Sequence, residues 1–166
     1  MRIIPQVKKY EESTGIADLT YLNWSFCDGL DGRVISAAKR FFPSTSGGVR
    51  VRIDSGSGMS EGYTLDITND GVYIRSGGPA GAFYAIMTLR QLLRDSRRIR
   101  CCSITDEPSM EYRGFYHDVS RGKIPNMDTL KALVDRMAEL KLNSLQLYIE
   151  HAFEFREYEF CRDDLG

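Results

Sequence analysis

The strongest constraint on the fold comes from the C-terminal part of the sequence, where a polar-ended strand, an amphipathic helix and an apolar strand follow one another. The segment Tyr112–Arg121 (YRGFYHDVSR) contains a predicted strand over 113–119. The spacing of apolar residues predicts a helix over 126–141 and a second strand over 143–149. We expect a βαβ unit with parallel strands and a right-handed crossover. Such a unit opens a large α/β domain, of which we expect this sequence to hold only a part.

The predicted helix is amphipathic. It follows Pro125, and Asn126 is its candidate cap. One face carries five apolar residues that we expect to be buried, namely Leu130, Leu133, Val134, Met137 and Leu140.

Residues 1–107 predict a separate small α+β domain. The expected elements are a helix at Leu30–Phe42 capped by Asp31, a strand at Val49–Asp54, a hairpin of strands 61–67 and 72–75, a helix opening at Pro79 and a strand at 98–105. We expect a mostly antiparallel sheet with helices on one face. Asp106-Glu107-Pro108 marks the boundary, and residues 108–166 form the second domain.

Composition narrows the function classes. Hydrophobic residues make up 42% and charged residues 27%, which is ordinary for a globular protein. A net charge of −1 argues against a nucleic-acid partner. Four cysteines without CxxC spacing and only two histidines argue against a metal site, and nothing indicates a cofactor. No signal peptide or membrane segment is visible. Reduced thiols favour the cytoplasm, but the location stays open.

Two groups of motifs carry a resemblance to a known family. The first group consists of Glu61–Leu65, Gly71–Ile74 and Gly81–Leu93. The second consists of Tyr112–Phe115, Asp118, Arg121 and Lys141–Asn143. In order and spacing they resemble glycoside hydrolase family 20, the β-N-acetylhexosaminidases. The resemblance implies that the first group belongs to the family's small α/β domain. It implies that the second group opens the family's (β/α)8 barrel.

The resemblance also implies a substrate-binding role for three residues. It places Arg113 at the end of the first barrel strand, where a guanidinium grips sugar hydroxyls; the alternative is an ion pair with Asp118 or another carboxylate. Asp118 is expected either to orient an active-site group or to fix its own loop. Glu150 stands where the family has another acidic contact, and it marks a divergent branch whose substrate preference is open. Aromatic residues after it, such as Phe153 and Phe155, are expected to pack under later barrel loops.

The resemblance implies that the catalytic pair is absent. The family uses substrate assistance: the acetamide oxygen of the substrate attacks the anomeric carbon, an Asp positions it and a Glu is the general acid. This pair belongs at the end of the fourth barrel strand. Asp106-Glu107 and Asp163-Asp164 do not follow an apolar strand at the matching place. We therefore expect a parent hydrolase that removes terminal N-acetylhexosamine from glycans, and an inactive fragment.

Two strands and one helix cannot close a barrel. The apolar face of Leu145, Leu147 and Ile149 would stay uncovered, so we expect the region 113–160 to dock or to self-associate. Two other functions remain open. One is a non-catalytic carbohydrate-binding or interaction module. The other is a different retaining barrel hydrolase, acting on hyaluronan-like or O-linked N-acetylglucosamine substrates.

Overall fold

The computed structural model describes residues 3–55, 58 and 60–150. The chain divides into two compact units, Met1–Ser109 and Met110–Gly166, and each is described by itself.

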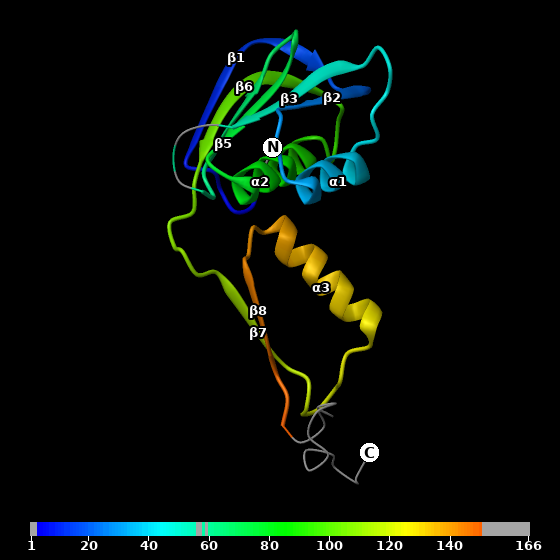
Figure 1. Cartoon of the computed structure of the whole chain (residues 1–166), viewed down its shortest axis with the longest axis vertical. Helices are drawn as coiled ribbons and strands as arrows, with labels where there is room; N and C mark the ends of the chain where they lie inside the picture. The colour runs from blue at the N-terminus through cyan, green and yellow to red at the C-terminus, as the bar shows by residue number, and fades with distance from the viewer. Residues whose placement is uncertain (1–2, 56–57, 59, 151–166) are drawn as a thin grey trace. The chain divides into compact units, whose positions relative to one another are not determined.

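The first unit is a six-stranded sheet with two helices on one face (Figure 1). Its elements in chain order are β1 (Lys9–Asp18), β2 (Leu22–Phe26), α1 (Gly32–Phe41), β3 (Val49–Ser55), β4 (Tyr63–Ile67), β5 (Gly71–Ser76), α2 (Pro79–Leu92) and β6 (Arg98–Asp106). The strand order is β1-β6-β4-β5-β3-β2. The β2–β3 and β3–β5 pairs are parallel and the other three are antiparallel. The predicted α+β class is confirmed.

The core of this unit lies between the sheet and α2. Alternate residues of β3, β4 and β5 point inward, and their largest fully buried members are Val51, Ile53, Leu65, Ile67, Val72 and Ile74. Helix α2 is buried almost all round and adds Ile86, Met87 and Leu89. Gly81, in the first turn of α2, lets the helix backbone lie close to the backbone of Gly62. A Cβ at position 81 would stand 2.3 Å from the carbonyl oxygen of Gly62.

The residue pattern correctly predicts α1, the β4–β5 hairpin and the start of α2. Asp31 caps α1, since its side chain accepts a hydrogen bond from the backbone N–H of Arg33. Gly78 precedes Pro79, which opens α2 as expected.

Strands β1 and β2 were not predicted from the sequence. Within β1, Ala17 alone is buried, so the strand shows no apolar alternation. It lies at an edge of the sheet and pairs with β6, which is far away in sequence. Its register shifts between Glu12 and Ile16, where Gly15 has a φ of +114°.

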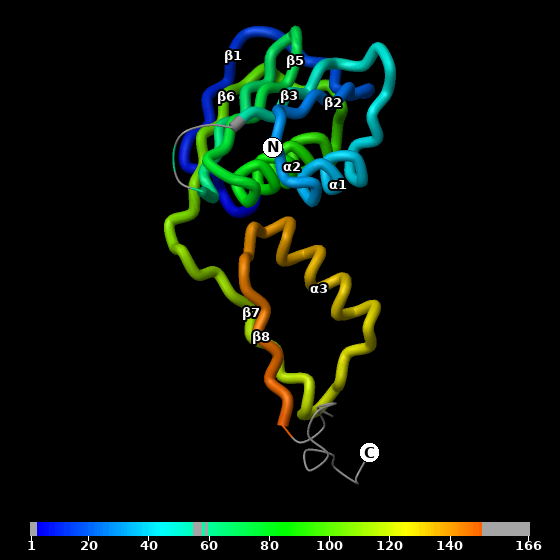
Figure 2. The backbone as a smooth tube through the Cα atoms, viewed as in Figure 1, coloured from blue at the N-terminus to red at the C-terminus, as the bar shows by residue number. Residues whose placement is uncertain are grey.

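The second unit contains the predicted βαβ arrangement. Strand β7 (Gly114–Asp118) pairs in parallel with β8 (Ser144–Tyr148), and α3 (Met127–Glu139) connects them (Figure 2). The cap prediction is confirmed, because the side chain of Asn126 accepts a hydrogen bond from the backbone N–H of Thr129 at 2.9 Å. Among the helices that the structure describes, none is long and apolar enough to cross a membrane.

The predicted burial of α3 is wrong in part. Met137 is buried, but Val134 and Leu140 are 49% and 40% exposed. A two-stranded ribbon is too narrow to cover a helix stripe. Neither β7 nor β8 contains a buried residue, and Phe115 and Leu147 stay about as exposed as Leu140.

Candidate substrate-binding site

The carboxyl ends of β7 and β8 bring two of the three candidate residues to the same edge. Asp118 is the last residue of β7, and its partner in the register is Tyr148, the last residue of β8. Glu150 follows β8 by two residues. Asp118 and Glu150 therefore lie at the same edge of the strand pair because the strands are parallel, although they are far apart in sequence.

Asp118 fixes the turn after β7. Its Oδ1 accepts hydrogen bonds from the backbone N–H of Ser120 at 2.8 Å and of Arg121 at 3.1 Å. The turn is also tied to β8, since the backbone N–H of Val119 donates to the carbonyl oxygen of Tyr148 at 3.0 Å. These backbone hydrogen bonds fix the loop, where a local salt bridge was expected, and the role of Asp118 toward an active-site group stays a prediction.

Arg121 and Glu150 form an ion pair across the two strand ends. The hydroxyl of Tyr148 donates to the same carboxylate oxygen at 2.9 Å, and the backbone N–H of Glu150 donates to Ser120 Oγ at 2.7 Å. The hydrogen bond and the negative charge of Glu150 raise the pKa of Arg121 above its ordinary value. The same carboxylate raises the pKa of the Tyr148 hydroxyl, first through the hydrogen bond and then through its negative charge.

The guanidinium of Arg121 also lies over the ring of Tyr148, with Cζ 5.5 Å from the ring centroid. Arg121 and Tyr148 are absent from the predicted set of binding residues. The sequence does contain a signal for Tyr148. It lies two residues before Glu150 at a strand end, and residues two apart in an extended chain point to the same side.

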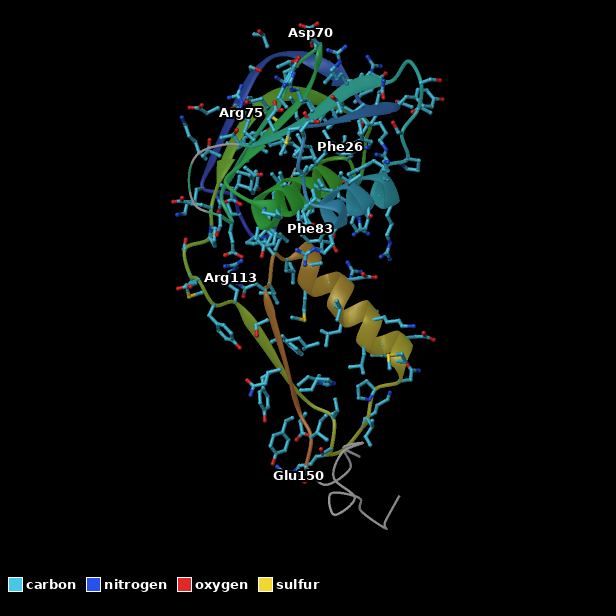
Figure 3. All side chains as sticks on the ribbon, in the orientation of Figure 1. Phe26, Asp70, Arg75, Phe83, Arg113 and Glu150 are labelled. Atoms are coloured by element: carbon cyan, nitrogen blue, oxygen red, sulfur yellow. The ribbon has the colours of Figure 1, made fainter. Side chains whose placement is uncertain are left out.

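The predicted position of Arg113 is wrong. It precedes β7, so it lies at the amino end of the strand, and Figure 3 shows Arg113 and Glu150 at opposite ends of the β7–β8 pair. The expected pairing of Arg113 with Asp118 is wrong for the same reason, since β7 separates them.

The guanidinium of Arg113 instead donates to backbone carbonyls, through Nε to Lys141 at 2.9 Å and through Nη1 to Met110 at 2.7 Å. Its own backbone exchanges hydrogen bonds with Asn143, whose side chain accepts at 2.9 Å and whose N–H donates at 2.9 Å. Arg113 therefore ties the amino ends of the two strands together. The sugar contact of Arg113 stays a prediction.

The acidic pair Asp106-Glu107 has a structural role. Asp106 is buried and accepts hydrogen bonds from the hydroxyl of Tyr63 at 3.1 Å and from the backbone N–H of Lys8 at 3.2 Å. Glu107 pairs with the ammonium of Lys8 at 2.9 Å. Asp163-Asp164 and the aromatic residues after Glu150 lie outside the described residues. Within the described ranges, no cluster of three or more His, Cys, Asp or Glu residues could hold a metal ion.

Comparison with known proteins gives a consistent result. The model of glycosyl hydrolase family 20, domain 2, matches residues 33–107. A β-hexosaminidase of Akkermansia muciniphila is 41% identical over 95 residues, which cover 54% of this chain and 19% of that protein. The chain spans between 10% and 19% of the length of the curated relatives it matches.

Solved structures extend the likeness to the second unit. The β-N-acetylhexosaminidase of Bacteroides fragilis NCTC 9343 has a TM-score of 0.81 and 22% identity, over 95% of this chain and 35% of that one. The family 20 β-N-acetylhexosaminidase of Streptomyces coelicolor A3(2) has a TM-score of 0.75 and 28% identity, over 90% of this chain and 35% of that one. The resemblance expected from the sequence is confirmed, and residues 33–107 match domain 2 of glycosyl hydrolase family 20.

Proposed function

We propose that this chain is part of a glycoside hydrolase that removes terminal N-acetylhexosamine from glycans by substrate-assisted, retaining hydrolysis. The observation that carries the proposal is that Asp118 and the Arg121–Glu150 ion pair lie together at the carboxyl ends of parallel strands β7 and β8. In (β/α)8 barrels this is the end at which substrate-binding and catalytic residues gather. The domain 2 match over 33–107 supports the same class of enzyme.

In this proposal the residues of the second unit bind the sugar rather than break the glycosidic bond. The guanidinium of Arg121 offers several fixed donors, and it is two-thirds exposed. A carboxylate has about four lone-pair sites, so Glu150 can accept from a sugar hydroxyl while it holds Arg121 and Tyr148. Such a donor and acceptor side by side match two neighbouring hydroxyl groups of one sugar ring. Asp118 contributes indirectly by holding the turn that carries Arg121.

The chemical step requires groups that the described residues do not supply at these strand ends. A general acid protonates the leaving oxygen while the acetamide of the substrate attacks the anomeric carbon, and water later opens the cyclic intermediate. We propose that the Asp-Glu pair for this step follows a later barrel strand. The 166-residue chain alone is then expected to release no sugar.

The decisive experiment measures hydrolysis by the full product of the gene. Chromogenic β-glycosides of N-acetylglucosamine and N-acetylgalactosamine are compared with the β-glucoside, which lacks the acetamide. Substrate assistance predicts rapid release from the N-acetylated sugars and little from the glucoside. Equal release from all three would exclude the mechanism, and release from none would exclude the enzyme class.

The same substrates separate this proposal from its rivals. A carbohydrate-binding module would bind N-acetylglucosamine without cleaving any glycoside. A barrel hydrolase of another specificity would cleave hyaluronan-like or O-linked N-acetylglucosamine substrates in preference to the simple terminal glycosides.

A further inference from the structure

Tyr148 makes two contacts that no role in sugar binding requires of it. Its hydroxyl donates to Glu150 Oε1 at 2.9 Å, and its ring lies under the guanidinium of Arg121 with Cζ 5.5 Å from the centroid. Arg121 and Glu150 pair with each other as well. One aromatic side chain therefore touches both members of an ion pair that joins two strands.

The backbone explains why Tyr148 can reach both partners. It ends β8 opposite Asp118, and its carbonyl oxygen accepts from the backbone N–H of Val119 at 3.0 Å, which pins it to the start of the turn. Arg121 belongs to that turn, so its guanidinium lies within reach of the Tyr148 ring. Glu150 lies two residues beyond Tyr148 on the same side of the extended chain.

The physical effect of such a ring is to narrow the positions that two long, exposed side chains can occupy. An exposed Arg–Glu pair alone gains little, because water screens it and both side chains lose rotamer freedom. A ring face attracts the guanidinium, and the phenolic hydroxyl directs the carboxylate. The two additions fix the pair at the place where the sugar is expected.

We propose that Tyr148 is a positioning residue that holds Arg121 and Glu150 in one arrangement for binding sugar hydroxyls, an inference that rests on the proposed glycosidase function. Tyr148 itself need not touch the sugar. Its hydroxyl donates to Glu150, and this hydrogen bond in turn raises the pKa of the hydroxyl above its ordinary value.

Three variants separate the two contacts. Tyr148→Phe keeps the ring and removes the hydroxyl, whereas Tyr148→Leu removes both. Tyr116→Phe is the matched control, because Tyr116 lies on β7 with its ring 6.1 Å from that of Tyr148 and loses the same hydroxyl group. Dispersed backbone amide NMR spectra verify folding of each variant.

The first readout needs no catalysis. In the 166-residue chain, NMR follows exchange of the Arg121 Nε–H proton with water, and Arg121→Lys assigns the signal. We expect exchange to become about fivefold faster in Tyr148→Leu and to stay unchanged in Tyr116→Phe. Unchanged exchange in Tyr148→Leu would overturn the positioning role even if the full gene product hydrolyses glycans.

The second readout is kinetic and uses the full gene product. A positioning role predicts a KM raised about fivefold in Tyr148→Phe and about tenfold in Tyr148→Leu, with kcat changed less than about twofold. A fall in kcat at constant KM would instead assign Tyr148 to the reacting atoms and would contradict the inference. If the wild-type product cleaves no glycoside, the proposed function fails, and the NMR exchange rates alone decide the positioning of Arg121.

Discussion

Arg121 and Glu150 form an ion pair that joins the turn after β7 to the segment after β8. The pair spans the carboxyl ends of two parallel strands, which would form the substrate-binding face in the barrel that we propose for the parent protein. Arg121 follows β7 and Glu150 follows β8, so the ion pair joins two segments that lie far apart in sequence. The pair therefore provides the most direct route to test whether this edge binds a sugar.

Removing the charge of Glu150 should weaken substrate binding. In the full gene product, Glu150→Gln keeps the shape of the side chain but loses a charged acceptor for sugar hydroxyls and for Arg121. We expect KM to rise about tenfold, because hydrogen bonds to charged groups are the stronger ones. Steady-state kinetics with a chromogenic N-acetylglucosaminide measures the change.

The control for this variant is Asp135→Asn. Asp135 is an exposed residue of α3, so its substitution removes one negative charge from the same unit without touching the strand ends. KM should then stay within about twofold of the original value. An equal rise in both variants would attribute the effect to net charge and not to a sugar contact.

The sequence predicted the elements that carry a strong local signal. The caps of α1 and α3 each depend on one side chain, Asp31 and Asn126, and both form as expected. The β4–β5 hairpin and the start of α2 at Pro79, which also depend on a few neighbouring residues, appear as expected too. Strand β1 lacked such a signal. Its polar residues pair with β6 at the edge of the sheet, so only a contact distant in sequence makes it a strand.

The candidate site was predictable to the extent that it depends on strand ends. Asp118 and Glu150 follow apolar runs, which places them at one edge once the strands are parallel. The error over Arg113 comes from the resemblance and not from the residue pattern. The predicted strand over 113–119 already begins at Arg113, which puts the side chain at the amino end of the strand, as β7 does.

Arg113 should contribute to stability and not to sugar binding. Arg113→Ala removes its hydrogen bonds to the carbonyl oxygens of Lys141 and Met110. We expect the free energy of unfolding of the second unit to fall by about 1–3 kcal/mol, because charge-assisted hydrogen bonds are lost. Urea denaturation followed by NMR signals of β7 and β8 measures it.

Lys131→Ala provides the comparison for this loss. Lys131 is an exposed residue of α3, and truncation of a solvated surface side chain changes stability by about 0.5 kcal/mol or less. If Arg113→Ala were as mild as Lys131→Ala, or if it abolished sugar binding without loss of stability, the structural role of Arg113 would be refuted.

The first unit should lose stability at alkaline pH. Burial, followed by the charge of Asp106, raises the pKa of Tyr63 well above its ordinary value, and burial raises the pKa of Cys102 to about 11. The folded state therefore keeps protons that the unfolded state releases. The stability from these groups is complete below their ordinary pKa values of 9 to 10 and falls as pH rises above them. Urea midpoints between pH 7 and pH 11 should decrease.

Tyr63→Phe tests the source of this decrease. The variant leaves Thr88 and Asp106 buried without the hydroxyl, so at pH 7 we expect a loss of about 1–3 kcal/mol in the free energy of unfolding. Its further decline toward pH 11 should be shallower than that of the wild type. Tyr21→Phe removes an exposed hydroxyl and should change neither value. If the stability of Tyr63→Phe declined toward pH 11 as steeply as that of the wild type, groups other than Tyr63 would cause the alkaline sensitivity.

Uncovered apolar side chains of the second unit should make the isolated chain self-associate. Phe115 and Leu147 are about 40% exposed on one face of the β7–β8 ribbon, since Phe115 pairs with Leu145 and His117 with Leu147 in the register. A two-stranded ribbon with an exposed apolar face gains by burying it against another copy. Light scattering after size exclusion should show a mass above 18.9 kDa that increases with concentration.

Two lysines on that face should reverse the self-association. Phe115→Lys combined with Leu147→Lys places two like charges on the ribbon, so the apparent mass should return to that of one chain. Ile16→Lys, at an exposed residue of β1 in the first unit, adds one charge elsewhere and should leave the association intact. A wild-type chain that stays monomeric at high concentration, with protected amides in β7 and β8, would show that this face is stable in water.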